Sequence, residues 1–283
     1  MAAITVEDII LQQSHRGMDI LRPLMADDFC RRAARHIYAL PRGTVLLTTG
    51  FFVGGAAESD GPAGTACLAL ALQELGFACV ILTDDWCRDY FEPLGLQVEY
   101  LPKDEAPSPS LLDRYAPVGL FSIERCGRND NGDYANMRGV SIRTATAPID
   151  DLFPAAAARG IFTLGIGDGG NEIGMGNVAA TVRSDLSLVP CIVTVDDLII
   201  ASVSNWGAYG LAACLSVLEG RDLMQNGDWL EGYLEKLAAM GCVDGVNREA
   251  VPTVDGYCLG TERHVLEELL AWERTALGQG SLL

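Results

Sequence analysis

The stretch of this sequence whose residue types and spacing most suggest chemistry is residues 165–176, Gly-Ile-Gly-Asp-Gly-Gly-Asn-Glu-Ile-Gly-Met-Gly. Six glycines in twelve residues indicate a backbone that turns sharply or approaches another group closely. Asp168, Asn171 and Glu172 stand between the glycines. Two carboxylates in such a turn favour a cation, so we expect Asp168 and Glu172 to act on an amine or to hold a metal ion.

The same stretch matches a dinucleotide-binding fingerprint, because Gly165, Gly167 and Gly170 have the spacing GxGxxG after a predicted strand. In that motif a pyrophosphate lies on backbone N–H groups, where Asp168 and Glu172 would repel it. We therefore expect no nucleotide cofactor. A purely structural glycine turn, whose acids only cap the next helix, stays open as an alternative.

A second polar segment, residues 123–139, follows a predicted strand and is rich in charged and amide side chains. Glu124 and Arg125 stand at the strand's end, where we expect them to point into a crevice and where they could pair. The planar guanidinium groups of Arg125 and Arg138 suit bidentate capture of a carboxylate. A solvated loop, held by the turn at Asn131 and Gly132, is the alternative for residues 129–131.

Two further groups of polar residues are less distinctive. Asn205, within the run Ser-Asn-Trp-Gly at residues 204–207, could orient a substrate; alternatively it caps a helix while Trp206 packs in the core. Glu58 and Asp60 lie in the loop after the first predicted strand, and turns at residues 244–245 and 255–256 each contain Asp-Gly.

Composition narrows the class of protein. The 283 residues are 49% apolar, enough for a substantial core, and no run approaches the ~20 apolar residues that span a bilayer. A net charge of −18 argues against a nucleic-acid partner, and we expect no membrane partner either. Nine scattered cysteines without a CxxC pair indicate reduced thiols, and acids throughout residues 1–40 do not fit a secretory or transit peptide. We expect a cytoplasmic protein; both a monomer and a homo-oligomer stay open.

The pattern along the chain predicts alternating strands and helices, and hence an α/β fold: three α/β/α layers around a mostly parallel, Rossmann-like sheet. We expect one α/β catalytic domain over residues 1–283, with a helical lead-in (1–40) and a helical C-terminal portion (220–283). The expected strands are 44–49, 78–82, 97–101, 118–123 and 161–164, the last of them central. The main expected helices are 66–75, 84–94, 149–158, 196–204, 207–218, 228–240 and 262–277.

Taken together, the motifs resemble the D-glutamate cyclase family, the catalytic C-terminal region of an animal mitochondrial enzyme that also occurs as stand-alone microbial proteins. The resemblance covers residues 45–260 and rests on the segments 167–176, 124–139, 204–207 and 60–62. It implies conversion of D-glutamate to 5-oxo-D-proline and water, with an amino acid as the small-molecule partner. It does not imply the mitochondrial address.

The expected chemistry assigns roles to these residues. Asp168 and Glu172 act on the amine or hold a hard cation, Mg²⁺ or Mn²⁺, because the chain has only three histidines. Glu124 is a further carboxylate and Tyr134 a candidate acid. The remaining candidates hold or orient the substrate: Arg125, Arg138, Asn136, Asn171, Asn205 and Asp60. A divalent-metal-dependent hydrolase acting on a phosphoester or an amide, and a non-catalytic amino-acid-binding protein, are the alternatives.

Overall fold

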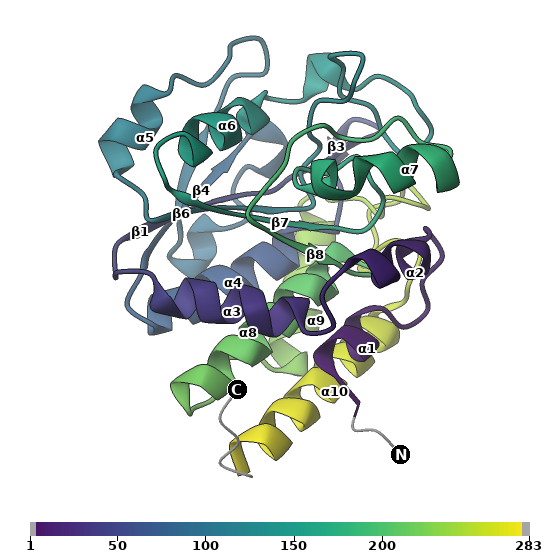
Figure 1. Ribbon diagram of the computed structural model, residues 1–283. Coiled ribbons are helices and arrows are strands. Elements are labelled where there is room, and N and C mark those ends of the chain that lie inside the picture. The colour runs from purple at the N-terminus through teal and green to yellow at the C-terminus, as the bar shows by residue number, and fades with distance from the viewer. Residues whose placement is uncertain (1–3, 279–283) are drawn as a thin grey trace.

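A six-stranded parallel sheet forms the centre of the computed structural model, which describes residues 4–278 (Figure 1). The strands run in the order β5-β4-β1-β6-β7-β8. Their bounds are β1 Thr44–Thr48, β4 Ala78–Thr83, β5 Gln97–Tyr100, β6 Gly119–Ile123, β7 Phe162–Gly167 and β8 Asp197–Ile200. Two short strands, β2 Phe52–Val53 and β3 Ala56–Ala57, pair separately as an antiparallel hairpin.

The strand order reverses between β1 and β6. Counted along the chain, the six strands have the order 3-2-1-4-5-6 of a doubly wound fold, and β1 pairs with β6 through Thr48 and Ser122. β6 in turn pairs with β7 through Ile123 and Ile166. In such sheets the crevice beyond the carboxyl ends of the strands at the reversal point is the usual ligand site. The loops that follow β1, β6 and β7 meet there.

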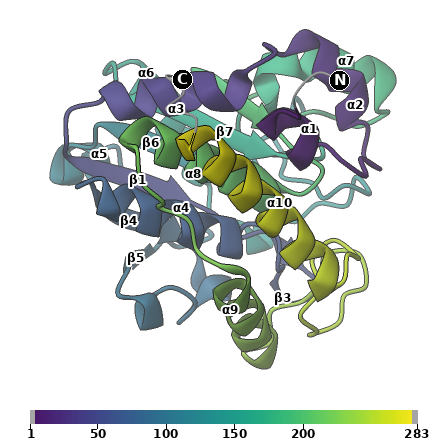
Figure 2. The same cartoon turned by 90° about the horizontal axis from the view of Figure 1, so that it is seen from below.

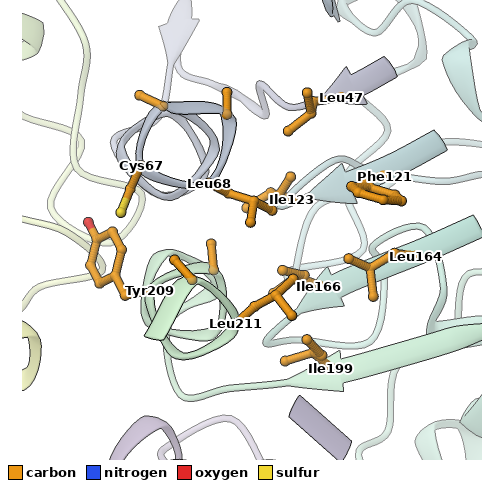
Figure 3. Close-up of a cluster of buried hydrophobic side chains, with 14 of the residues drawn as sticks. Leu47, Cys67, Leu68, Phe121, Ile123, Leu164, Ile166, Ile199, Tyr209 and Leu211 are labelled. Atoms are coloured by element: carbon orange, nitrogen blue, oxygen red, sulfur yellow. The ribbon is translucent and has the colours of Figure 1, made fainter. Parts of the chain in front are cut away.

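Helices cover both faces of the sheet, which confirms the predicted three-layer α/β/α architecture. On one face lie α3 Phe29–Ala39, α4 Pro62–Glu74 and α8 Ser204–Glu219, which pack on one another and on the strands (Figures 1 and 2). The opposite face carries α5 Ser110–Tyr115 and α6 Leu152–Ala157. α7 Ala179–Asp185 follows the glycine-rich segment. Figure 3 shows Leu68 of α4 and Leu211 of α8 directed at Ile123, Ile166 and their neighbours in the sheet.

The two helices nearest the reversal point are apolar on all sides, as expected of helices that are buried between a sheet and other helices. They approach closely because α4 carries glycine at the contact: a Cβ on Gly64 would lie 2.8 Å from the Cα of Asn205. A larger residue there would push α8 away from α4. The start of α8 is therefore held beside the start of α4.

A further layer of terminal helices lies over α8, in agreement with the prediction of extra helices at both ends. α10 Leu259–Gly278 packs on α8, α9 Gly227–Ala239 and α1 Val6–Ile10 (Figure 2). Trp206 of α8 is fully buried and donates its Nε1–H to Glu262 of α10 at 2.7 Å. The shorter elements are α2 Met18–Leu21, η1 Arg22–Leu24, η4 Arg143–Ala145, η5 Ile149–Asp151 and η6 Met175–Val178. None of the helices in residues 4–278 is long and apolar enough to span a bilayer.

Three predicted elements were wrong. Residues 196–204 do not form a helix: they contain the edge strand β8, a short apolar run whose periodicity does not distinguish strand from buried helix. Residues 84–94 form only two 3-10 turns, η2 Asp85–Cys87 and η3 Glu92–Leu94, because Asp89 has φ +65° and Pro93 interrupts the helical hydrogen bonding. β7 is next to the edge strand, and the central pair is β1 and β6.

Candidate active site

Three buried carboxylates meet beyond the carboxyl ends of the strands. Asp60, Glu124 and Asp168, which we call the acidic cluster, each offer an oxygen within 4.8 Å of the others, and all three side chains are buried. Asp60 comes from the loop after β1, Glu124 directly follows β6 and Asp168 directly follows β7. The doubly wound topology thus brings together three acids that are far apart in sequence.

The carboxylate of Asp60 is positioned by the start of α8. Its Oδ2 accepts from the backbone N–H of Ser204 at 2.8 Å, and its Oδ1 accepts from that of Asn205, also at 2.8 Å. Asn205 completes the link: its Oδ1 accepts from Gly61 and Gly64, and its Nδ2 donates to Ser59. The amide that the sequence nominated for orienting a substrate is therefore fully engaged in fixing the Asp60 loop to α8.

Glu124 has an unusual backbone conformation. Its φ is +46°, a left-handed conformation that costs a non-glycine residue about 1–3 kcal/mol and that clusters at functional sites. The turn directs its carboxylate to the acidic cluster, where Oε2 accepts from the Ser204 hydroxyl at 2.6 Å. Gly61, with φ +99°, makes room for it: a Cβ there would lie 3.0 Å from that of Glu124 and 2.4 Å from Thr49 Oγ1.

A single arginine faces the acidic cluster from the N-terminal segment. Arg16, between α1 and α2, donates from one terminal nitrogen to both oxygens of Asp168, at 2.8 and 2.9 Å. Its other terminal nitrogen lies 2.6 Å from Asp255, close enough for an ion pair although outside hydrogen-bond geometry. Arg16 thus partly neutralises two buried carboxylates at once.

The carboxyl groups outnumber this arginine. Glu58 and Glu172 are also buried beside the acidic cluster, and Glu172 Oε2 accepts from the N–H of Gly170 at 2.7 Å. Burial raises the pKa of Asp60 to about 7, against the hydrogen bonds from Asn205 and Ser204 that lower it. Burial, reinforced by the neighbouring acids, also raises the pKa of Glu124 well above its usual value. The site must therefore retain protons or bind a cation.

For Asp168 and Glu172 the opposing contributions are different. Burial raises the pKa of the Asp168 carboxyl, while Arg16 lowers it. Burial likewise raises the pKa of Glu172, while the N–H of Gly170 lowers it. Burial thus raises the pKa of both Asp168 and Glu124 well above the usual value; the two differ in that Arg16 opposes the rise at Asp168, whereas no cation in the described part of the chain forms an ion pair with Glu124.

A small cavity, which we call the acidic pocket, opens beside these groups. Its volume is about 40 Å³, and Glu124, Glu172 and Asn171 contribute to its lining together with Arg16 and Glu58. Arg138 and Arg248 line it as well. Neither arginine forms an ion pair within 4.0 Å with any residue in the described part of the chain. The pocket therefore combines buried anionic groups with two cations that are free to bind an anion.

The structure brings most of the sequence-predicted residues to this site. Glu124, Glu172, Asn171, Asn136 and Arg138 line the acidic pocket. Asp60 and Asp168 belong to the acidic cluster. Asn136 accepts from the N–H groups of Arg138 and Val140, so it shapes the tip of the loop that carries Arg138.

Arg125 and Tyr134 lie elsewhere. Arg125 is fully buried, and it pairs with Asp84 at 2.9 Å instead of with Glu124. It also donates to the carbonyls of Gly50 and Ala147, both at 2.7 Å, so its guanidinium is engaged in holding loops together. Tyr134 donates its hydroxyl to Asp150 at 2.5 Å and lines a different cavity. The structure gives neither side chain a contact with the acidic pocket.

Arg16 and Arg248 were missed by sequence reasoning. Arg16 precedes Gly17 in a segment with no motif, and Arg248 follows the Asp-Gly turn at residues 244–245. That turn was noted only as a turn, although Gly245 lines the pocket and lies so close to Glu58 that a Cβ there would be 2.3 Å from Glu58 Oε2. The one usable sign was the repeated occurrence of Asp-Gly after residue 240, since these turns lie beside the acidic pocket: Gly245 lines it, and Asp255 pairs with Arg16.

The acidic cluster could hold a metal ion. Its donors are all carboxylate oxygens, which suit a hard divalent ion. The set differs from the predicted pair Asp168 and Glu172, because Asp60 and Glu124 join Asp168 in place of Glu172. Arg16 already binds both oxygens of Asp168, so an ion would have to share that carboxylate with the guanidinium or displace it.

Comparison with known proteins identifies the family of this chain. Residues 6–270 match the sequence model of a family described as "D-glutamate cyclase-like, C-terminal". The chain is also 35% identical over 207 residues to a human protein named "D-glutamate cyclase, mitochondrial", a match that covers 62% of this chain and 33% of the human protein. The chain thus spans about a third of the length of that relative. Because the family match covers nearly the whole described chain, the protein belongs to the D-glutamate cyclase-like family.

Proposed function

We propose that this protein is a lyase that cyclises D-glutamate to 5-oxo-D-proline with loss of water. The observation that carries the proposal is the pairing, in one pocket, of buried carboxylates with two unpaired arginines. Membership of the D-glutamate cyclase-like family and the name of the human relative support the choice of substrate. The proposal extends the family assignment to a particular reaction.

The charges of the pocket complement those of glutamate. An α-ammonium group is stabilised near the excess of carboxylates at the acidic cluster, where it relieves their mutual repulsion. The two substrate carboxylates need cations, and Arg138 and Arg248 provide guanidinium groups suited to bidentate binding. Arg125, which the sequence nominated for this role, is replaced in the proposal by Arg248.

The reaction requires proton transfer at two places. The α-ammonium loses two of its three protons, and the nitrogen forms a bond to the γ-carboxyl carbon. A C–O bond of that carboxyl group breaks, so that one oxygen leaves as water. The nitrogen loses two protons in total and the departing oxygen gains two, so no other reactant is needed. A general base near the amine and a general acid near the γ-carboxyl each accelerate such a reaction by about 10²–10⁴-fold.

Asp168 and Glu124 are suited to these two roles. Asp168, whose ionised form Arg16 favours against the effect of burial, accepts a proton from the ammonium, with Glu172 as a neighbouring carboxylate. Glu124, whose pKa burial raises, keeps a proton that it can donate to the departing oxygen. Ser204 holds the Glu124 side chain in place through its hydroxyl. The contact with Arg16, which Asp168 makes and Glu124 does not, is the difference in environment that assigns the base to the one and the acid to the other.

A divalent ion fits the same residues. Asp60, Glu124 and Asp168 would hold Mg²⁺ or Mn²⁺ through oxygen atoms. When bound, such an ion supplies positive charge that polarises a carboxyl oxygen. The carboxylate of Asp60 would be ready to bind the ion, because the N–H groups at the start of α8 already hold it in place.

The acidic pocket has to widen for glutamate. A volume of about 40 Å³ accommodates a small cation or a few water molecules, and not a whole amino acid. The wall best able to move is the exposed tip of the loop that carries Met137 and Arg138, which is closed mainly by the hydrogen bonds of Asn136. We propose that this tip moves outward to admit substrate and returns to bring Arg138 onto a carboxylate.

The test is to incubate the protein with D-glutamate and, separately, L-glutamate, with and without EDTA, and to quantify 5-oxoproline by chiral chromatography. We expect the lactam from the D-enantiomer together with an equal loss of primary amine. Glu124→Gln should reduce the rate by about 10²–10⁴-fold. The control is Glu7→Gln, because Glu7, like Glu124, is a buried carboxyl that accepts a hydrogen bond, in this case from the backbone N–H of Cys30, but it lies outside the site. No lactam from either enantiomer, under any condition, would refute the proposal.

Metal-dependent hydrolysis of a phosphoester or an amide is the second candidate, because the acidic cluster is also a plausible divalent-ion site. It predicts hydrolysis of generic ester or amide substrates that EDTA abolishes, without lactam formation. Binding of D-glutamate without any turnover would instead favour an amino-acid-binding protein.

A further inference from the structure

A second cavity, larger than the acidic pocket, lies on the other side of the loop that follows β6. Its volume is about 420 Å³, which falls in the usual range for small-molecule sites. Its lining includes three cationic side chains, Lys103, Arg128 and Arg143, and we call it the basic pocket. None of the three members of the acidic cluster contributes to it.

The charges of the basic pocket are not fully paired. Arg128 forms an ion pair with Asp151, a second lining residue, and lies 3.5 Å from Asp150. Within the described chain, Lys103 and Arg143 make no ion pair within 4.0 Å. Of the acids that line the cavity, only Asp104 is left to oppose them. An excess of positive charge in a cavity is notable in a chain whose net charge is −18.

Both unpaired cations are held in position by other contacts. Lys103, one of two lysines in the chain, lies with its Nζ 4.8 Å from the centroid of the Trp86 ring. That indole donates to the carbonyl of Ala145 at 2.7 Å, so the wall that carries Lys103 is tied to the wall that carries Arg143. Arg143 donates to the carbonyl of Gly132. The two cations therefore face one cavity from two separate segments of the chain.

We propose that the basic pocket binds a small organic or inorganic anion with two or more carboxylate or phosphate groups. One anionic group would lie against the Lys103 ammonium, and another would take the planar guanidinium of Arg143 in a bidentate contact. The hydroxyl-bearing Thr144 and Thr146 also line the cavity and add polar surface. This site is distinct from the acidic pocket and does not depend on the proposed cyclisation.

The test is isothermal titration calorimetry at low ionic strength, on EDTA-treated protein, with citrate and inorganic pyrophosphate as separate probes. The double variant Lys103→Gln/Arg143→Gln should weaken binding about tenfold or more. The matched control is Lys236→Gln/Arg274→Gln, which removes the same charge from exposed positions on α9 and α10. A second control, Arg138→Gln, removes a cation from the acidic pocket and should leave anion binding unchanged. Thermal melts establish that each variant is folded.

Each outcome bears on the proposal. Binding of citrate, of pyrophosphate or of both, lost in the first double variant alone, supports the site and identifies the anionic group it prefers. Absence of binding by both probes overturns it. Equal weakening in the Lys236/Arg274 control means that the anions respond to overall charge, and loss in Arg138→Gln means that they bind at the acidic pocket; either result also overturns it.

Discussion

The acidic pocket and the basic pocket share one wall, the segment 128–143, yet they are built in opposite ways. The carboxylates of the acidic pocket are buried and fixed by backbone N–H groups, as at Asp60 and Glu172. The free cations of the basic pocket lie nearer the surface, and Arg143 is exposed. Buried charge has to be matched by fixed dipoles or by a ligand, whereas exposed charge is already stabilised by water.

This difference indicates which pocket is better suited to a chemical reaction. Fixed, buried carboxyl groups have raised pKa values, which suit proton transfer near neutral pH. Exposed cations keep their charge and suit reversible binding. Arg125 connects the two regions, because it donates to Gly50 at the end of β1 and to Ala147 beside the basic pocket. The following predictions test this division between a reacting pocket and a binding pocket.

The largest effect is expected in the acidic pocket. Asp168→Asn removes the carboxylate that Arg16 holds, so turnover of D-glutamate should fall by about 10³-fold, measured as 5-oxoproline formation. Tyr134→Phe, which removes a hydroxyl in the basic pocket, should change the rate only a few-fold. The reverse ranking of these two variants would place the chemistry in the basic pocket.

The connection between the pockets should have a large effect on stability. Arg125→Met leaves the Asp84 carboxylate buried without its partner, which should lower the free energy of unfolding by about 3–5 kcal/mol. Urea denaturation measures this loss. The double variant Arg125→Met/Asp84→Asn should recover part of it, because it removes the unpaired charge as well. A loss below about 1 kcal/mol in the single variant would mean that Arg125 does not hold the two regions together.

A smaller effect, on stability against pH, follows from Asp60. Its pKa is about 7 in the folded protein and 3.8 in its ordinary state, so between these values the folded chain binds a proton that the unfolded chain has lost. Its contribution to stability is therefore complete below the lower value and falls as pH rises toward the upper one. Melting temperatures across this window should decrease with rising pH, and Asp60→Asn should flatten the slope.

The effect of an added metal ion on the melting temperature is a second test of the charges in the acidic cluster. If the acidic cluster takes up Mg²⁺ or Mn²⁺, the added ion should raise the melting temperature most at the upper end of the window, where the carboxyl groups are ionised. An unchanged melting temperature at every pH would argue against a divalent ion at this place. A slope that Asp60→Asn leaves intact would assign the pH dependence to other groups.

The smallest effect is expected for Arg248, one of the arginines that line the acidic pocket. Arg248→Gln should raise the KM for D-glutamate by about tenfold with little change in kcat, because a cation that binds a carboxylate in both the ground and transition states contributes mainly to affinity. Arg143→Gln, the comparable change in the basic pocket, should leave KM unaltered. Steady-state kinetics of both variants, compared with the unaltered protein, separates the two pockets again.

The sequence predicted the three layers. It nominated Asp60, Glu124 and Asp168 as separate site residues, with Asp168 and Glu172 as the metal pair, and it missed Arg16 and Arg248. Apolar runs such as residues 44–49 and 78–82 identify buried strands of a parallel sheet, and the motif around Asp168 identifies the catalytic edge. β8 was missed because its four residues read equally well as strand or helix. Local pattern therefore identified most strands that a continuous apolar run marks, and it failed for β8, whose run also fits a buried helix, and for residues 84–94, where Asp89 and Pro93 break the helix.

The roles of individual arginines depend on tertiary contacts that no local pattern reveals. Arg125 follows Glu124 at a strand's end, so its sequence position favours the crevice, yet its side chain turns to Asp84 of another loop. Arg16 reaches Asp168 from 152 residues away. Asn205 was nominated for its amide, which is indeed at the site but engaged with the backbone of Gly61 and Gly64. The type of each residue indicated that it could take part in the site, but the sequence did not indicate which group its side chain contacts.

The buried indole of Trp206 gives this molecule an optical reporter next to its chemistry. It follows Asn205 in the chain and lies 5.2 Å, between ring centroids, from Tyr257, whose neighbour Asp255 faces Arg16. Trp86 lies close to the basic pocket in the same way, because its ring contacts Lys103, which lines that pocket. The chain has two further tryptophans, Trp229 and Trp272. Replacing both of these and one of the first two would leave a single indole beside one pocket, so events in the two pockets could be followed separately in real time without an attached dye.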